Sequence, residues 1–225
     1  MALILHINTA FDTASVMLSS GTDILYELQN ASPKGHASFL EPAIKSVLEE
    51  AGMPLSDVDA VSVLNGPGSY TGLRVGLSSA KALCYALQKP LILLNTLDVM
   101  GLALKLQATV ADENILYCPM IDARRQEVFT ALYNSALTLV KPYSSEIAGE
   151  NFLGEEIKKE RSLVLGGNGS HKFEKITDYR KIIYVNPLII SKPLIILANN
   201  ACINQVFSSV AYSEPFYLKP VYFKK

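Results

Sequence analysis

Residues 59–72 read Asp-Ala-Val-Ser-Val-Leu-Asn-Gly-Pro-Gly-Ser-Tyr-Thr-Gly. The apolar run over 59–64 predicts a strand, and the Asn-Gly-Pro-Gly turn at 65–68 ends it. Thr71 then caps a predicted helix over 71–88. A buried strand, a glycine-rich turn and a helix in this order are the core of one α/β unit.

The same alternation continues on both sides of this stretch. Pro90 stops the helix, and a further strand at 91–94 precedes a helix at 97–107. Upstream, Ser38 and Glu41 have the spacing of a capping box before a helical pattern that ends at Gly52. Strands that alternate with helices predict an α/β fold.

A hairpin pattern occurs twice along the chain, about 114 positions apart. The first copy has apolar runs at 3–7 and 14–18 around a polar corner, and the second has runs at 115–121 and 128–133. A repeat of this length predicts two α/β domains of similar topology. We place them at 1–105 and 106–225.

Composition excludes several classes of protein. Of the 225 residues 49% are hydrophobic and 18% charged, which predicts a packed globular protein and excludes a disordered chain. The net charge of −1 lacks the basic excess of an autonomous nucleic-acid binder. Three cysteines without paired spacing favour reduced thiols, and we expect no secretory signal and a cytoplasmic location.

The segment that carries a resemblance is 65–81, Asn-Gly-Pro-Gly-Ser-Tyr-Thr-Gly-Leu-Arg-Val-Gly-Leu-Ser-Ser-Ala-Lys. It is similar to the TsaB (YeaZ) family, which takes part in threonylcarbamoyladenosine synthesis on tRNA. The resemblance extends to Gly35-His36, to Pro-Met-Ile-Asp-Ala-Arg-Arg-Gln-Glu-Val-Phe at 119–129, and to Pro-Phe-Tyr-Leu-Lys at 215–219.

This resemblance implies a two-domain fold of the actin, sugar kinase and Hsp70 type, which is ribonuclease H-like. It implies no catalytic activity and no cofactor. The expected partner is the TsaD transferase, with the TsaE ATPase and tRNA reached through the complex, and a homodimer when the chain is alone. The family's partner interface is built from two helices, which here are 36–51 and 71–88.

The residues of the second helix agree with such a role. Arg74, Ser78, Lys81, Tyr85 and Gln88 form one narrow polar stripe, and most other positions are apolar or small. Gly72, Gly76 and Ser79 leave either a shallow surface for a partner helix or a surface for tight packing on the domain's own sheet. The predicted partner-binding residues are His36, Phe39, Leu40, Ala43, Gly72, Leu73, Gly76, Ser79, Ala80 and Leu83.

The alternative function is an ATPase or phosphotransferase of the same fold. Asn8, Thr9, Gly66 and Gly68 would then form a vestigial nucleotide loop, in which a neutral Asn8 stands where a magnesium-binding carboxylate is common. Asp12 or Asp122 would have to replace that carboxylate. A strand-to-helix turn is the preferred explanation of Gly66 and Gly68. Gly-Gly-Asn-Gly at 166–169 is either a vestigial second nucleotide loop or a plain turn after a strand.

The sequence gives little support to a serine hydrolase or to a metal site. Ser69 lacks the glycines of a nucleophile elbow, which would be needed at positions 67 and 71. His36 has Leu40 where a second metal ligand would fall, so we expect no metal site.

The modest basic clusters are Arg124 with Arg125 and the tail residues Lys219, Lys224 and Lys225. Solvated surface is their default interpretation. They are also the first place to look for a contact with tRNA.

Overall fold

The computed structural model describes residues 1–30, 35–110, 112–149, 151–159, 161–174 and 179–219. Their contacts define two compact units. Unit 1 comprises Met1–Thr96 and Ser191–Phe216, and unit 2 comprises Leu97–Ile190 and Tyr217–Lys225. Lys224 and Lys225 lie outside the described residues.

Unit 1 is built on a five-stranded sheet in the order β3-β2-β1-β4-β5. Its strands are β1 (Leu3–Asn8), β2 (Ser15–Ser20), β3 (Asp23–Gln29), β4 (Ala60–Gly66) and β5 (Leu91–Asn95). β1 is antiparallel to β2 and parallel to β4, and Ile7 lies opposite Val16. The first predicted hairpin is confirmed by this register.

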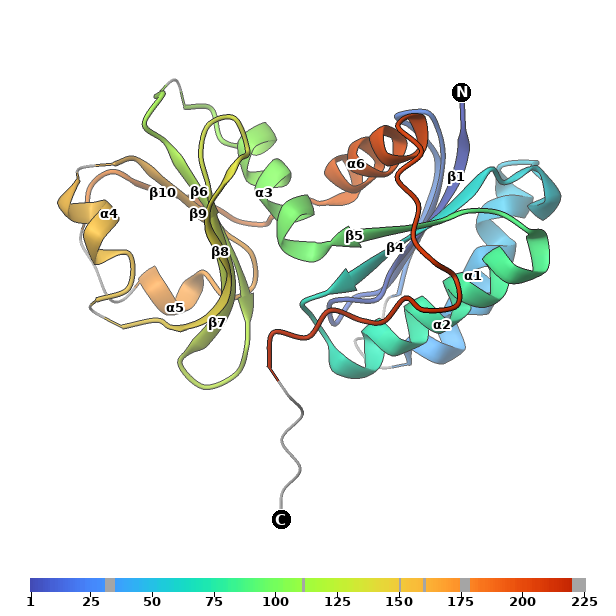
Figure 1. Cartoon of the computed structure of the whole chain (residues 1–225), viewed down its shortest axis with the longest axis horizontal. Helices are drawn as coiled ribbons and strands as arrows, with labels where there is room; N and C mark the ends of the chain where they lie inside the picture. The colour runs from blue at the N-terminus through green and yellow to red at the C-terminus, as the bar shows by residue number, and fades with distance from the viewer. Residues whose placement is uncertain (31–34, 111, 150, 160, 175–178, 220–225) are drawn as a thin grey trace, which may run out of the picture. The chain divides into compact units, whose positions relative to one another are not determined.

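Helices cover both faces of that sheet. α1 (His36–Glu50) and α2 (Tyr70–Leu87) pack on one face and α6 (Ser191–Ile203) on the other (Figure 1). A 3-10 turn, η1 (Leu55–Asp57), follows α1. Every residue of β1 is buried because neither face of the strand meets solvent.

The core between the sheet and the pair α1 and α2 is apolar. It includes Leu5, Ile7, Val16, Leu40, Val47, Val63, Leu77 and Ala80. His6 alternates with Leu5 and Ile7 along β1 and so points to the opposite face, where its Nδ1 lies 2.7 Å from Ser62 Oγ and its Nε2 lies 2.7 Å from Ser19 Oγ. Burial lowers the pKa of His6 to about 3, so the ring stays neutral at physiological pH.

Unit 2 repeats the topology. Its sheet has the order β10-β9-β6-β7-β8, formed by β6 (Leu116–Asp122), β7 (Glu127–Tyr133), β8 (Leu139–Ile147), β9 (Leu163–Gly166) and β10 (Ile182–Val185). β6 is antiparallel to β7 and parallel to β9, as β1 is to β2 and β4. The predicted duplication and α/β fold class are therefore confirmed.

Three helices belong to unit 2, with only the first residue of α3 counted in unit 1: α3 (Thr96–Gln107), α4 (Gly154–Lys158) and α5 (His171–Glu174). The core of unit 2 contains Leu116, Met120, Val128, Leu163 and Phe173. The Phe152 and Phe173 rings meet edge to face with centroids 5.2 Å apart. Within the described residues, no helix combines the length and apolarity that crossing a bilayer requires.

The division into units differs from the predicted boundary at residue 105 in two ways. First, that boundary falls inside α3, which packs on the second sheet: Tyr133 and Tyr143 both donate to Asp98 Oδ1, at 2.6 and 2.8 Å. Second, α6 returns to the first sheet, where Ser191 Oγ donates to Glu27 Oε1 at 2.9 Å. The chain therefore enters unit 2 earlier than predicted and leaves it again.

The start of α2 also differs from the prediction. Ser69 is the N-cap, because its Oγ accepts a hydrogen bond from the Gly72 amide at 3.3 Å. Thr71 lies one residue inside the helix and is exposed. Gln88 closes the other end in a left-handed conformation, just before Pro90.

Candidate functional site

The ten predicted partner-binding residues separate into a buried and an accessible set. Six are buried in unit 1: Leu40, Ala43, Gly72, Leu73, Gly76 and Ala80. The other four, His36, Phe39, Ser79 and Leu83, are partly exposed. Burial leaves these six side chains little surface for a second protein, so the four accessible residues are the better candidates for direct contact.

The glycines of α2 face the chain's own first hairpin. A Cβ on Gly72 would lie 2.0 Å from the Thr9 carbonyl oxygen, and one on Gly76 would lie 2.2 Å from Thr9 Oγ1. Thr9 Oγ1 also donates a hydrogen bond to the Gly72 carbonyl at 2.8 Å. Of the two interpretations of these glycines, tight packing of the helix on its own sheet is the one that the geometry supports.

The outer side of α2 is a ridge of different residues. We define the α2 ridge as Thr71, Arg74, Ser78, Ala82 and Tyr85, all of them exposed. Side chains at positions 78 and 82 are small, and they lie between Arg74 and Tyr85, which is 75% exposed. The Arg74 guanidinium stacks over the Tyr70 ring, 4.0 Å from its centroid.

A shallow groove of about 390 Å³ separates this ridge from α1. We call it the α1–α2 groove, and its lining residues are Ala37, Leu40, Glu41, Arg74, Val75, Ser78 and Ser79. Ser79 Oγ donates to Glu41 Oε1 at 2.6 Å across it. Sequence reasoning missed Ala37, Thr71 and Ala82, although their helical positions beside Ser78 and Glu41 were a usable signal.

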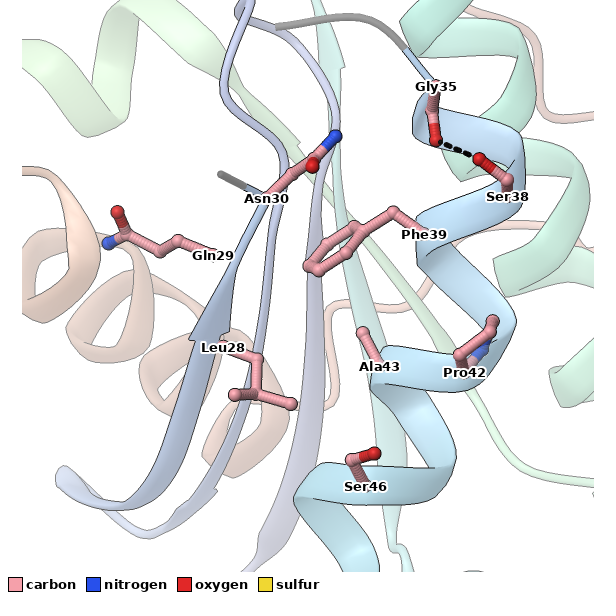
Figure 2. Close-up of a pocket in the computed structure, with 9 residues that line it drawn as sticks. All are labelled: Leu28, Gln29, Asn30, Gly35, Ser38, Phe39, Pro42, Ala43 and Ser46. Carbon is pink, nitrogen blue, oxygen red and sulfur yellow. Dashed lines mark hydrogen bonds between the residues drawn. The ribbon is translucent and has the colours of Figure 1, made fainter. Parts of the chain in front are cut away.

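Phe39 and Ala43 belong to a second groove, on the other flank of α1. This groove has a volume of about 460 Å³ and runs between α1 and β3 (Figure 2). The Phe39 ring points from α1 toward the sheet, with Ala43 and Leu28 on either side of the groove (Figure 2). The predicted patch of Phe39 and Ala43 is thus separate from the α2 ridge.

The remaining flank of α2 is covered by the C-terminal part of unit 1. Lys81 Nζ donates to the carbonyls of Ala211 and Ser213, each at 3.1 Å. The Phe216 amide donates to the Asn65 carbonyl at 2.7 Å, and the segment runs along α2 in Figure 1. Because Lys81 holds this segment, it is part of a packed contact rather than of the open polar stripe.

The residues of the vestigial nucleotide loop lie close together, and their contacts leave no space between them for a ligand. Asn8 Oδ1 accepts from the Ala10 amide at 3.2 Å, and the Ser69 amide donates to the Ala10 carbonyl at 2.7 Å. A Cβ on Gly68 would lie 2.4 Å from that same carbonyl, and one on Gly66 would lie 2.4 Å from the Phe216 carbonyl. These glycines therefore seal the loop instead of opening it to a phosphate.

The two substitute carboxylates have different surroundings. Asp12 is exposed, and Asp122 lies in unit 2 with its Oδ1 2.5 Å from Lys172 Nζ. No group of three or more His, Cys, Asp or Glu residues suited to a metal occurs in the described part of the chain. His36 is the first residue of α1, while Leu40 is 1% exposed.

The glycines at 166–169 also serve packing. A Cβ on Gly167 would lie 2.4 Å from the Met120 carbonyl oxygen, and one on Gly169 would lie 2.9 Å from the Ile121 carbonyl carbon. The stretch is the turn from β9 to α5, which agrees with the simpler of the two interpretations.

Comparison with solved structures defines the class of protein first. The chain is similar to YeaZ from Pseudomonas aeruginosa, with a TM-score of 0.77 over 97% of this chain and 100% of that one at 23% identity. It is also similar to the polyphosphate/ATP-glucomannokinase of Arthrobacter sp. strain KM, with a TM-score of 0.54 over 91% and 100% at 12% identity. The expected actin and sugar kinase type of fold is confirmed.

Sequence comparison then gives the family. The family model described as "TsaD: tRNA N6-adenosine threonylcarbamoyltransferase" matches residues 29–213, and the chain belongs to that family. It is 33% identical to TsaB of Bacillus subtilis over 62% of this chain and 59% of that protein. It is 28% identical to TsaB of Buchnera aphidicola (subspecies Schizaphis graminum) over 82% and 89%. The resemblance to TsaB is confirmed.

The match to several relatives is partial in length. The chain spans 59% of the Bacillus subtilis protein and 64% of an uncharacterized Mycobacterium bovis relative that is 33% identical.

Proposed function

We propose that this chain is a non-catalytic subunit in threonylcarbamoyladenosine modification of tRNA, and that it binds and stabilises the TsaD transferase. The TsaB relatives supply the pathway through their name, tRNA threonylcarbamoyladenosine biosynthesis protein. The proposal includes contact with the TsaE ATPase and with tRNA through the complex. It also includes a cytoplasmic location and self-association of the chain when the transferase is missing.

The observation that carries the proposal is the α2 ridge with the α1–α2 groove beside it. The inner side of α2 packs on its sheet, one flank contacts α1, and Lys81 holds the C-terminal segment on the other. Only the outer side, with small residues at Ser78 and Ala82, remains open in the described part of unit 1. Small side chains let a partner's backbone approach closely, so this side suits a docked helix.

The sealed loop supports a non-catalytic role. The Ser69 amide donates to the Ala10 carbonyl and the Gly72 amide to Ser69 Oγ, so two amides at the start of α2 are already used. An anion at a helix N-terminus needs such amides unoccupied.

The alternative is an ATPase or phosphotransferase, and the fold shared with the glucomannokinase favours it. Such an enzyme would bind Mg-ATP in isolation. Binding and turnover that depend on Asp12 or Asp122 would replace the scaffold proposal with this one.

The test is an Ala82→Arg variant in a co-purification with the TsaD transferase. Arg is a good helix former, so the exposed substitution leaves the fold intact while a long cation blocks close approach. Asn200→Arg is the matched control, since it is an exposed helical position on α6. We expect Ala82→Arg to abolish co-purification and Asn200→Arg to keep it. Retention by a folded Ala82→Arg protein would refute the interface.

A further inference from the structure

The two hairpin corners of the duplicated fold have different surroundings. In unit 1 the corner after β1 is sealed by α2, whose Gly72 and Gly76 press on Thr9. In unit 2 the helix after β9 is α5, which has only four residues. The turn from β9 to α5 packs on the start of the corner after β6, with Gly169 beside Ile121, but it leaves Arg124, Arg125 and Gln126 exposed.

The backbone of this corner is well defined. The Ala123 amide donates to the Glu127 carbonyl at 3.0 Å, and the Glu127 amide donates to the Arg124 carbonyl at 3.1 Å. Arg124 and Arg125 both have left-handed conformations, with φ of 68° and 49°. Two adjacent guanidinium groups thus extend from a closed turn rather than from a loose loop.

Each of the two carboxylates at this corner forms an ion pair with a lysine. Asp122 Oδ1 lies 2.5 Å from Lys172 Nζ, whose side chain is only 8% exposed, and Glu127 Oε2 pairs with Lys219 Nζ. Burial opposes ionisation of Asp122, but hydrogen bonds from Lys172 and the Arg124 amide outweigh it and lower its pKa. The hydrogen bond from Lys219 lowers the pKa of Glu127. Both carboxylates remain ionised and paired.

This pairing leaves a local excess of positive charge. The corner holds four cations, Arg124, Arg125, Lys172 and Lys219, and two carboxylates, a net charge of +2 in a chain whose total is −1. Arg125 acts on Glu127 at longer range, yet no ion pair within 4.0 Å joins either arginine to a carboxylate among the described residues. A guanidinium presents paired donors that match the oxygens of a phosphate.

We infer that Arg124 and Arg125 form an RNA contact, in which two guanidinium groups bind backbone phosphates of the tRNA. The inference rests on the proposed function, because the chain's low net charge leaves it dependent on the transferase for most of the RNA affinity. The contact positions RNA without reading its bases. An acidic protein surface is the competing occupant, and the experiment separates the two.

The experiment measures binding of a fluorescent tRNA to the complex of this chain with the TsaD transferase, by anisotropy at several salt concentrations. The test variant is Arg124→Gln with Arg125→Gln, which removes both charges and keeps the side-chain stems. The matched control is Lys158→Gln with Lys159→Gln, an adjacent and exposed pair elsewhere in unit 2. A charge-preserving Arg124→Lys, Arg125→Lys variant completes the set.

Loss of two phosphate contacts should make the slope of log affinity against log salt shallower by about 1.4 to 1.8, and weaken binding at least about tenfold near 0.1 M salt. The lysine control pair should stay near wild type. The charge-preserving variant should keep the wild-type salt slope and lose only the affinity that the paired guanidinium donors supply. Unchanged tRNA affinity of the glutamine variant would overturn the inference. The inference would also be overturned if the glutamine variant formed less complex while the remaining complex bound tRNA with unchanged affinity. That result would identify a contact with protein. Complex formation of the wild-type chain with the transferase is measured separately. Failure of the wild-type chain to form the complex would contradict the proposed function, independently of the RNA contact.

Discussion

A methyl group added at Gly76 tests how closely α2 packs on its sheet. In Gly76→Ala the new Cβ would lie 2.2 Å from Thr9 Oγ1 and 3.3 Å from Ile7 Cγ2. Thr9 is fully buried and its hydroxyl is held by the Gly72 carbonyl, so the side chain has no free space to enter. Either α2 or the first hairpin must shift.

The expected magnitude follows from two opposing terms. Ala in place of Gly inside a helix stabilises by about 0.5–1 kcal/mol when nothing obstructs it. Overpacking of a close contact costs about 1–3 kcal/mol. Gly76→Ala should therefore lower the free energy of unfolding by up to about 2.5 kcal/mol, whereas an open surface groove would give a gain.

A double-mutant cycle identifies the contact responsible. Thr9→Ala removes Oγ1 at a cost of about 1 kcal/mol for its hydrogen bond, and it should relieve most of the clash in the double variant. Gly72→Ala is the control, because its new Cβ would meet the Thr9 backbone oxygen, at 2.0 Å, which Thr9→Ala does not remove.

The assay is urea unfolding followed by far-ultraviolet circular dichroism, since the chain has no tryptophan to report fluorescence. A Gly76→Ala protein that is more stable than wild type would refute the packing argument. Additive effects of Thr9→Ala and Gly76→Ala would refute the named contact.

Two further predictions concern titration and nucleotide binding. Because burial lowers the pKa of His6 to about 3, the unfolded chain binds the proton more readily, and stability is full above about pH 6.5 and falls as pH drops. Between pH 6.5 and 5 the loss should be about 2 kcal/mol, and His6→Asn should flatten this slope in unfolding curves; an unchanged slope would contradict the assignment. The sealed loop around Gly68 predicts no heat of binding in calorimetry of the isolated chain with Mg-ATP, and micromolar binding would contradict it.

The strands and their duplication were predictable because apolar runs and polar corners recur in the sequence itself. The two copies, at 3–18 and 115–133, matched the observed hairpins to within a residue or two. Local chemistry also predicted the stop of α2, since Pro90 excludes a continuing helix.

The direction in which a glycine faces was not predictable in the same way. Gly72 and Gly76 are compatible with a helix whose glycine side faces a partner and with one whose glycine side faces the domain's own sheet. The contact that decides between the two is with Thr9, more than sixty residues away in the sequence. Likewise, nothing local to α6 says that it returns to the first sheet, because Ser191 and Glu27 meet only in the folded chain. Long-range contacts decided the features that the sequence left open.

Docking of α2 on the transferase is tested by the initial rate of threonylcarbamoyladenosine formation on tRNA. The reconstituted mixture contains the TsaD transferase, the TsaE ATPase and the threonylcarbamoyl donor. At a limiting concentration of this chain, wild type and Asn200→Arg should raise the rate equally, and folded Ala82→Arg should leave it at the level without the chain. A full rate with Ala82→Arg would contradict the claim that this chain acts by docking the outer side of α2 on the transferase.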